Sequence, residues 1–309
     1  MSLAMHEITG HIPGPHLLIT GGVHGDEFEP MAAIRTLIAR LQPSELRGRV
    51  TLVPVVNEAA FRRGQRTAED GFDLARTCPG RRDGSATEQI AFELSALIRT
   101  ADYYIDLHTG GTRYQVLPLV GYSLHREPSV LDIQRRMALA FGLPMIWGTD
   151  PNLDGRSLSV ARDANIPAIY AEYLGGGGCD PDGVRAYVDG CRNVLAEFGM
   201  LSDSILPPQS PPHVVEDDRP NSGHMQINHP APCEGFFESA VKLGQHVQAG
   251  ERLGTVCDVL GKGVEPINAR YGGKVIVLHT FSRVDAGEGV AVVLETSPLA
   301  PEGGEGARG

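Results

Sequence analysis

Two contrasting residue patterns in the sequence predict an α/β fold followed by a small all-β domain. In the first two thirds, short apolar segments alternate with amphipathic stretches of helical period. Nearly continuous apolar strands separated by such helices are typical of a mostly parallel or mixed central sheet flanked by helices. Beyond about residue 207, the segments become short, glycine-rich and strand-like. We therefore expect an α/β domain at 1–206, a β-sandwich accessory domain at 207–300 and a disordered tail at 301–309.

The α/β elements can be followed in chain order. Strands are expected where apolar, β-branched and aromatic residues run up to glycine or asparagine: HLLITGG (16–22), RVTLVPVVN (49–57), DYYIDLHTGG (102–111) and IPAIYAEYLGG (166–176). Helices are expected where apolar residues recur every three or four positions: EPMAAIRTLIARL (29–41), ATEQIAFELSALIRT (86–100) and GVRAYVDGCRNVLAEFGML (183–201).

The accessory domain begins after a proline-rich junction at 203–220, DSILPPQSPPHVVEDDRP. Segments 234–258 and 269–295 share a pattern of strand, small turn and second strand. This pattern resembles the two halves of a biotinyl/lipoyl-type β-sandwich. Lys262 lacks the flanking residues of a carrier lysine in such domains, so an accessory role is the simpler interpretation.

Charge and cysteine content exclude several classes of protein. The 27 Lys plus Arg against 38 Asp plus Glu give a net charge of -11, which argues against a nucleic-acid or anionic-membrane partner. The five cysteines are scattered and form no C-x-x-C pair, so neither a disulfide framework nor a thiolate zinc site is indicated. Without an export signal or an apolar run of about 18 residues, a cytoplasmic location is expected. A homo-oligomer remains compatible with the sequence.

Titratable side chains cluster where three predicted strands end. His24 and Glu27 follow the first strand in ITGGVHGDEFEP, His108 precedes a glycine pair, and Glu172 precedes four glycines. In open α/β sheets, ligands bind beyond the carboxyl ends of the strands. An H-x-x-E pair alone is more often solvated, but two imidazoles and a carboxylate at one edge form a zinc set with an open position. Glu172 is then the spare carboxylate, suited to act as a base.

These motifs resemble a known family. GGVHGDE, DLHTGG and the glutamate of AEYLGG are similar, in order over residues 17–180, to the succinylglutamate desuccinylase/aspartoacylase family of zinc carboxypeptidase-like hydrolases. The resemblance implies one Zn²⁺ per chain with His24, Glu27 and His108 as its ligands. It also implies that Glu172 is the general base.

The segment between the ligand motifs, VVNEAAFRRGQRTAEDGFDLARTCPG (55–80), adds substrate residues by the same resemblance. The family has an asparagine, an arginine that polarises the scissile carbonyl, and a D-L-N-R motif that holds a substrate carboxylate. Asn57, Arg66 and Arg76 match by position, although Arg62 and Arg63 compete with Arg66. A guanidinium suits both tasks, because it pairs with carboxylates in bidentate fashion and stabilises a developing oxyanion.

One departure concerns the substrate. Ala75 replaces the asparagine of D-L-N-R, and a methyl group cannot make the hydrogen bonds of an amide. This puts N-acetylaspartate and N-succinylglutamate in doubt as substrates and leaves the reaction class intact.

Other polar residues have weaker interpretations. Asp106 shares a strand face with His108, so it could either orient that ligand or be a buried structural aspartate. His224, His229 and His279 are most simply surface or packing residues, and Cys179 has no evident activating partner.

The sequence therefore predicts a zinc-dependent hydrolase that cleaves the amide bond of a small N-acyl amino acid with metal-activated water. Glu172 and Arg66 are the expected catalytic residues, and Asn57 and Arg76 the expected substrate-binding residues. The alternatives are a zinc carboxypeptidase acting on a short peptide or cell-wall fragment, and a non-catalytic metal-binding homologue.

Overall fold

The computed structural model describes residues 3–202, 210–225 and 228–295. The chain divides into two compact units, Met1–Gly223 and His224–Gly309. The first unit extends past the predicted boundary at 206/207, because strand β8 (His213–Glu216) pairs in parallel with β6 (Met145–Thr149) of that unit. The predicted tail at 301–309 lies outside the described residues. None of the helices in the described ranges is long and apolar enough to cross a membrane.

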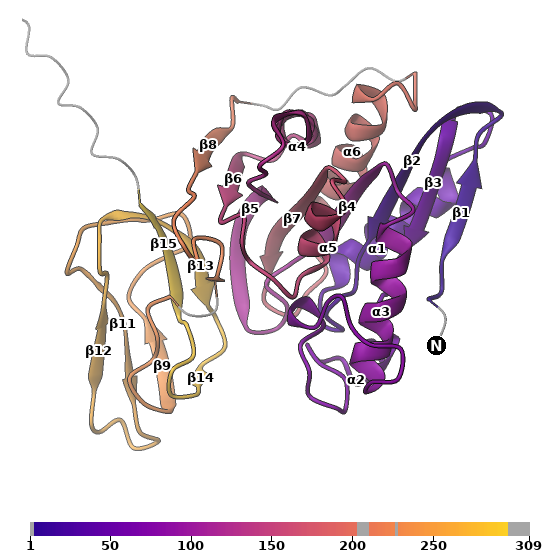
Figure 1. Cartoon of the computed structure of the whole chain (residues 1–309). Coiled ribbons are helices and arrows are strands. Elements are labelled where there is room, and N and C mark those ends of the chain that lie inside the picture. Colours follow the sequence, from indigo (N-terminus) through magenta and orange to yellow (C-terminus); the bar gives the residue numbers. More distant parts are fainter. Residues whose placement is uncertain (1–2, 203–209, 226–227, 296–309) are drawn as a thin grey trace, which may run out of the picture. The chain divides into compact units, whose positions relative to one another are not determined.

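The first unit is built on a mixed sheet, as the sequence predicts (Figure 1). Most neighbouring strands are parallel, and the antiparallel pairs are β1 with β3 and β5 with β7. In spatial order the strands are β1 (His6–Thr9), β3 (Arg47–Val53), β2 (Ile12–Thr20), β4 (Tyr103–His108), β7 (Ala168–Gly175), β5 (Tyr114–Ser123), β6 and β8.

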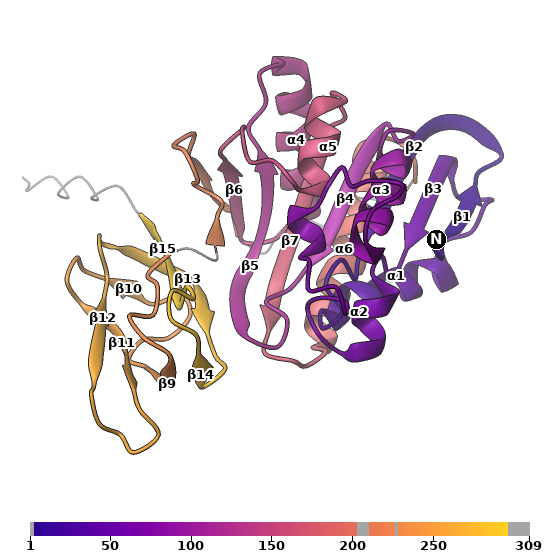
Figure 2. The same cartoon turned by 60° about the horizontal axis from the view of Figure 1, so that its bottom comes forward.

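Helices cover both faces of this sheet, which is why its central strands are apolar on both sides (Figure 2). Helices α1 (Phe28–Arg40), α4 (Pro128–Phe141) and α6 (Pro181–Glu197) pack on one face, around a core that includes Ile34, Met137 and Tyr187. Helices α3 (Ala86–Ile98) and α5 (Ser157–Asp163) pack on the other face. Two short helices, α2 (Glu58–Arg63) and η1 (Leu74–Arg76), lie in the connection between β3 and α3.

Local chemistry fixes where these helices begin and end. Ser85 and Glu88 form a reciprocal capping box at the start of α3. Helix α4 begins at Pro128, whose fixed φ suits the first turn, and ends at Gly142, which adopts a φ of 85°.

The second unit is all β and antiparallel. Strand β13 (Gly273–His279) pairs with β10 (His246–Val247) and with β15 (Ala291–Glu295). A separate 4-stranded sheet has the order β12 (Glu265–Asn268), β11 (Arg252–Cys257), β9 (Gly235–Ser239) and β14 (Arg283–Val284). Small valine-rich cores stabilise these sheets. The small all-β domain predicted from the sequence is thus confirmed.

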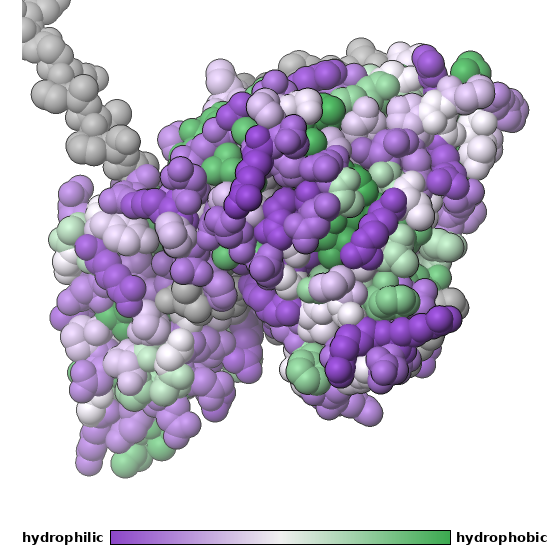
Figure 3. Space-filling view, viewed as in Figure 1, coloured by the Kyte–Doolittle hydropathy of each residue, from purple (hydrophilic) through white to green (hydrophobic). Residues whose placement is uncertain are grey.

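The face of the molecule drawn in Figure 3 is mostly hydrophilic, and its hydrophobic residues gather in small groups. Three of the large hydrophobic side chains that the structure shows as exposed, Val259, Leu260 and Val264, lie in the connection between β11 and β12.

Candidate active site

The predicted site residues meet at the carboxyl ends of β2, β4 and β7. His24 and Glu27 lie in the turn that joins β2 to α1, and Glu27 is the residue just before that helix. His108 is the last residue of β4 and pairs in register with Glu172 of β7. The prediction that three strand ends deliver these side chains to one edge of the sheet agrees with this arrangement.

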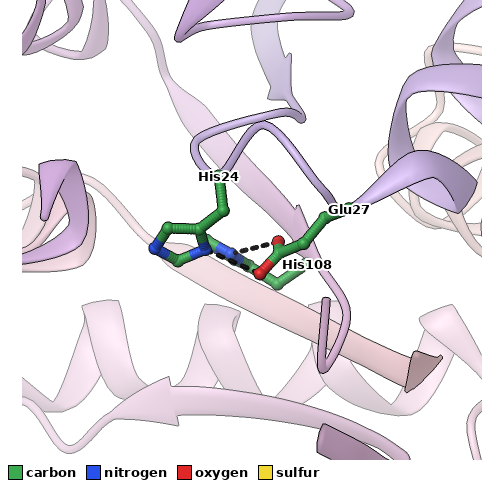
Figure 4. Close-up of side chains that lie close together, drawn as sticks. All are labelled: His24, Glu27 and His108. Atoms are coloured by element: carbon green, nitrogen blue, oxygen red, sulfur yellow. Dashed lines mark hydrogen bonds and ion pairs between the residues drawn. The ribbon is translucent and has the colours of Figure 1, made fainter. Parts of the chain in front are cut away.

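The carboxylate of Glu27 lies between the two imidazoles (Figure 4). Its Oε1 is 2.6 Å from His24 Nδ1, and its Oε2 is 3.0 Å from His108 Nδ1. One ligand atom from each of the three side chains falls within 4.8 Å of the others. Glu27 is 1 % exposed and His24 is 3 % exposed, whereas His108 is only partly buried.

This donor set fits a metal ion such as Zn²⁺. Both Nδ1 atoms and one carboxylate converge, which is the composition of catalytic zinc sites. Burial raises the pKa of Glu27, but the charges of His24 and His108 outweigh burial and lower it below its ordinary value. Burial has the opposite effect on His108 and lowers its pKa, but the negative charges of Asp106 and Glu27 outweigh burial and raise the pKa of His108 well above its ordinary value. The carboxylates thus favour positive charge at the point where the three side chains meet.

Asp106 orients His108 from behind. Its Oδ2 lies 3.2 Å from His108 Nε2, and it accepts hydrogen bonds from Thr20, at 2.7 Å, and from Ser157. The sequence left open whether Asp106 orients a ligand or is a buried structural residue. The side chain is 1 % exposed and contacts His108, so both descriptions apply.

Asp73 does the same for His24, and the sequence reasoning missed it. Its Oδ1 is 3.0 Å from His24 Nε2, and its Oδ2 accepts bonds from Arg66 Nη2, at 2.9 Å, and Nε, at 3.2 Å. Burial raises the pKa of Asp73, but the His24 hydrogen bond and the Arg66 charge outweigh burial and lower it strongly. The signal was available, since Asp73 is the first residue of the D-L-A-R motif that also contains Ala75 and Arg76.

The structure distinguishes the three competing arginines. Arg66 Nη1 lies 3.9 Å from Glu27 Oε1, and Asp73 fixes its guanidinium. Arg62 instead pairs with Glu58 on the surface of α2, and the exposed Arg63 bonds to Gln65. Of these three, Arg66 is the one placed beside the His–Glu cluster.

Glu172 is buried, and its Oε2 has no hydrogen-bond partner among the described residues. Burial raises the pKa of Glu172 to about 7, while the positive charge of His108 opposes the rise. A carboxyl group poised near neutral pH can both accept and return a proton.

Arg76 has a second arginine beside it. Gly155, the residue before Arg156, packs against the backbone of Arg76: a Cβ added at Gly155 would lie 2.7 Å from the carbonyl oxygen of Arg76. Arg156 is therefore close to Arg76 in the fold. Burial, and then the charge of Arg156, lower the pKa of Arg76 to about 10. Two neighbouring guanidinium groups favour an anion between them. Arg156 could not be predicted from motif spacing, because it lies on a different loop.

Asn57 has the contacts of a helix cap. It is fully buried, and its Oδ1 accepts a bond of 3.1 Å from Ala60 N at the start of α2. Its Nδ2 has no partner within the described part of the chain.

Three histidines and one cysteine were also given weaker interpretations from the sequence. His224, His229 and His279 belong to the second unit, where His229 bonds to the backbone of Ala291 and Arg270. Cys179 is an exposed free thiol.

Comparison with known proteins identifies the family. Residues 13–198 match the model of the succinylglutamate desuccinylase/aspartoacylase catalytic domain. The chain belongs to this family. The curated proteins that it matches include an N-alpha-acetyl-L-2,4-diaminobutyric acid deacetylase from Halomonas elongata. That deacetylase is 33% identical over 297 residues, which cover 91% of this chain and 82% of the relative.

Solved structures of the succinylglutamate desuccinylase/aspartoacylase family share the fold of nearly the whole chain. A succinylglutamate desuccinylase from Silicibacter sp. TM1040 has a TM-score of 0.85 and 26% identity, and covers 94% of this chain and 88% of its own. The product-bound ectoine utilization protein EutE (DoeB) from Ruegeria pomeroyi also has a TM-score of 0.85, with 28% identity, and covers 94% and 87%. These relatives place the chain in a family of hydrolytic deacylases.

Proposed function

We propose that the protein is a zinc-dependent hydrolase that removes the acyl group from a small N-acyl amino acid. The observation that carries this proposal is the convergence of His24, Glu27 and His108 at one point, next to the unpartnered carboxylate of Glu172. These three residues would hold one zinc ion per chain. When bound there, zinc supplies Lewis-acid chemistry: it polarises a carbonyl and makes water acidic enough to attack it near neutral pH.

Residues of the chain itself transfer the proton and stabilise the charge that develops during the reaction. Glu172 takes a proton from the attacking water and returns it to the departing amine, since its Oε2 has no hydrogen-bond partner among the described residues. Arg66 stabilises the negative charge that develops on the carbonyl oxygen, and Asp73 keeps its guanidinium in place. Asp106 and Asp73 hold the outer nitrogens of the two histidines, which leaves both Nδ1 atoms directed at the metal position.

The substrate half that carries the amine is an amino acid with a free carboxylate. Arg76 and Arg156 provide two adjacent positive charges for that carboxylate. Because the Halomonas relative is a deacetylase, we infer that the acyl group is acetyl. Similarity to a deacetylase of this kind favours a small N-acyl amino acid over a peptide as the substrate of this protein.

The test is a panel of N-acetyl and N-succinyl amino acids together with short peptides, scored for released amine with and without a zinc chelator. We expect release from at least one N-acetyl amino acid, no comparable release from peptides, and loss of the activity with chelator. Release from peptides alone, or release that chelation does not affect, would contradict the proposal.

A further inference from the structure

Tyr170 of β7 lies on the same side of the sheet as the site and has no role in the chemistry above. Tyr170 precedes Glu172 by two residues, so both side chains point to the same face of the sheet. Its ladder partners are Asp106 on β4 and Gly121 on β5. Tyr170 therefore lies two residues further from the strand ends than the pair of His108 and Glu172.

The ring of Tyr170 covers the backbone of β5 at Gly121. A Cβ added at Gly121 would overlap Cε1, Cζ and the hydroxyl of Tyr170. The phenol thus occupies the place that a side chain at position 121 would fill. Any larger residue at 121 would displace it, so the glycine fixes where the hydroxyl lies.

That hydroxyl makes no hydrogen bond to any residue that the structure describes, whereas the fully buried tyrosines of the same sheet are paired. Tyr104 bonds to Thr20 at 2.8 Å, and Tyr122 donates to Glu216 at 2.6 Å. Tyr170 is only partly buried, so its unpaired hydroxyl is accessible to a bound molecule and is suited to a ligand.

Arg156 lies on the same side of Tyr170. The residue after it, Ser157, donates a hydrogen bond to Asp106, which is the ladder partner of Tyr170. The Nε of Arg156 is buried and has no partner among the described residues. Burial raises the pKa of Tyr170, the charge of Glu172 raises it further, and Arg156 opposes both. The phenol therefore keeps its proton and is a hydrogen-bond donor.

We propose that Tyr170 is a specificity-determining residue whose hydroxyl donates a hydrogen bond to the carboxylate of the amino-acid half of the substrate, next to Arg156. The carboxylate is favoured over the scissile carbonyl because Tyr170 is in register with Asp106 and neighbours Arg156, whereas Arg66 lies beside Glu27. This inference rests on the proposed deacylase function and assigns one more contact to its substrate.

The test compares Tyr170→Phe with wild type, using N-alpha-acetyl-L-2,4-diaminobutyric acid and the analogue in which its carboxylate is a carboxamide. Steady-state kinetics gives KM and kcat, and calorimetry gives the Kd of each probe. We expect Tyr170→Phe to raise KM and Kd for the acid about 10- to 100-fold, because the lost bond is made to a charged group. We expect kcat to change by less than about twofold, since the contact is the same in ground and transition states. With the carboxamide, the effect should fall below about threefold.

The matched control is Tyr173→Phe, the same atomic change on the opposite face of β7. It should leave KM, Kd and zinc content unchanged. An unchanged KM and Kd in Tyr170→Phe would overturn the inference, as would an equal loss with the carboxamide or a loss confined to kcat. If wild type binds the acid without hydrolysing it and Tyr170→Phe weakens that binding, deacylation of this substrate fails and the contact stands. If wild type neither binds nor hydrolyses it, the contact to this substrate is overturned, and the panel of N-acyl amino acids decides the deacylase proposal separately.

Discussion

Asp73 joins two functional side chains through one carboxylate. Each of its oxygens faces a different partner, His24 on one side and Arg66 on the other. Because Oδ1 also accepts from Ala75 N, the carboxylate is anchored to the backbone of η1. A single residue therefore couples the position of a proposed metal ligand to that of the proposed oxyanion-binding arginine.

We expect Asp73→Asn to weaken both functions. An amide of the same size loses the negative charge and can accept from only one of the two partners. Zinc affinity, measured by chelator competition, should fall about 10- to 100-fold, as for other groups that orient metal ligands. Asp70→Asn is the control, because Asp70 lies in the same connection but bonds to Thr87. Unaltered zinc affinity and kcat in Asp73→Asn would refute the coupling.

Glu172→Gln tests the proton transfer. The substitution keeps the shape and removes the base, so kcat should drop about 10²- to 10⁴-fold while zinc content and unfolding remain near wild type. Loss of zinc in this variant would make Glu172 a ligand and would undermine the assignment of Glu27. Retention of zinc together with near-normal turnover would mean that the base lies elsewhere.

Sequence predicted the strongly patterned elements well. Helix α3 and strands β4 and β7 fall within predicted stretches, and α1, α6, β2 and β3 overlap theirs but begin one to four residues earlier, because apolar periodicity marks an element better than its first residue. No element was assigned to 112–165, where β5, α4, β6 and α5 form. Pro118 and Gly121 interrupt the apolar run of β5, and both residues weaken a strand assignment from sequence alone.

The residues of the candidate site also fall into a group that the sequence predicts and a group that it does not. The side chains at strand ends, His24, Glu27, His108 and Glu172, were found because strand topology alone brings them to one edge. Asp73, Arg156 and Tyr170 were missed, because their place depends on how two loops and a neighbouring strand fold against one another. Spacing along the chain does not carry that information.

Gly25→Ala probes the element that carries two of the proposed ligands. Gly25 lies between His24 and Glu27, and an added Cβ would overlap the backbone of Ala60 at α2. We expect the free energy of unfolding to fall by about 1–3 kcal/mol or more and zinc affinity to decrease, because backbone atoms must move. Urea denaturation and chelator competition measure the two effects. Gly178→Ala, where the new methyl group meets no atom within 4 Å, should change neither quantity. Equal behaviour of the two variants would contradict this account.

The two units of the molecule have separate apolar cores, and the proposed metal ligands all belong to the first unit. The consequence is that damage to the second core should spare metal binding.

Leu253→Ala is the corresponding test. Leu253 is fully buried in the second unit, so its truncation should cost about 2–5 kcal/mol of unfolding free energy. Zinc content of the folded protein should stay at the wild-type level. Leu260→Ala, at a side chain that is 74 % exposed, is the control and should change stability by less than about 0.5 kcal/mol. Loss of zinc in folded Leu253→Ala protein would show that the second unit contributes to the metal site.

Zinc stoichiometry measured together with turnover tests the central claim most directly. Purified protein should contain about one zinc per chain, since the three proposed ligands form one open site. Chelation should remove the zinc and abolish release of amine from an N-acetyl amino acid, and added zinc should restore both. His108→Ala should contain almost no zinc under the same conditions. Full turnover in metal-free protein, or a full zinc complement in His108→Ala, would contradict the assignment of this site as the catalytic metal centre.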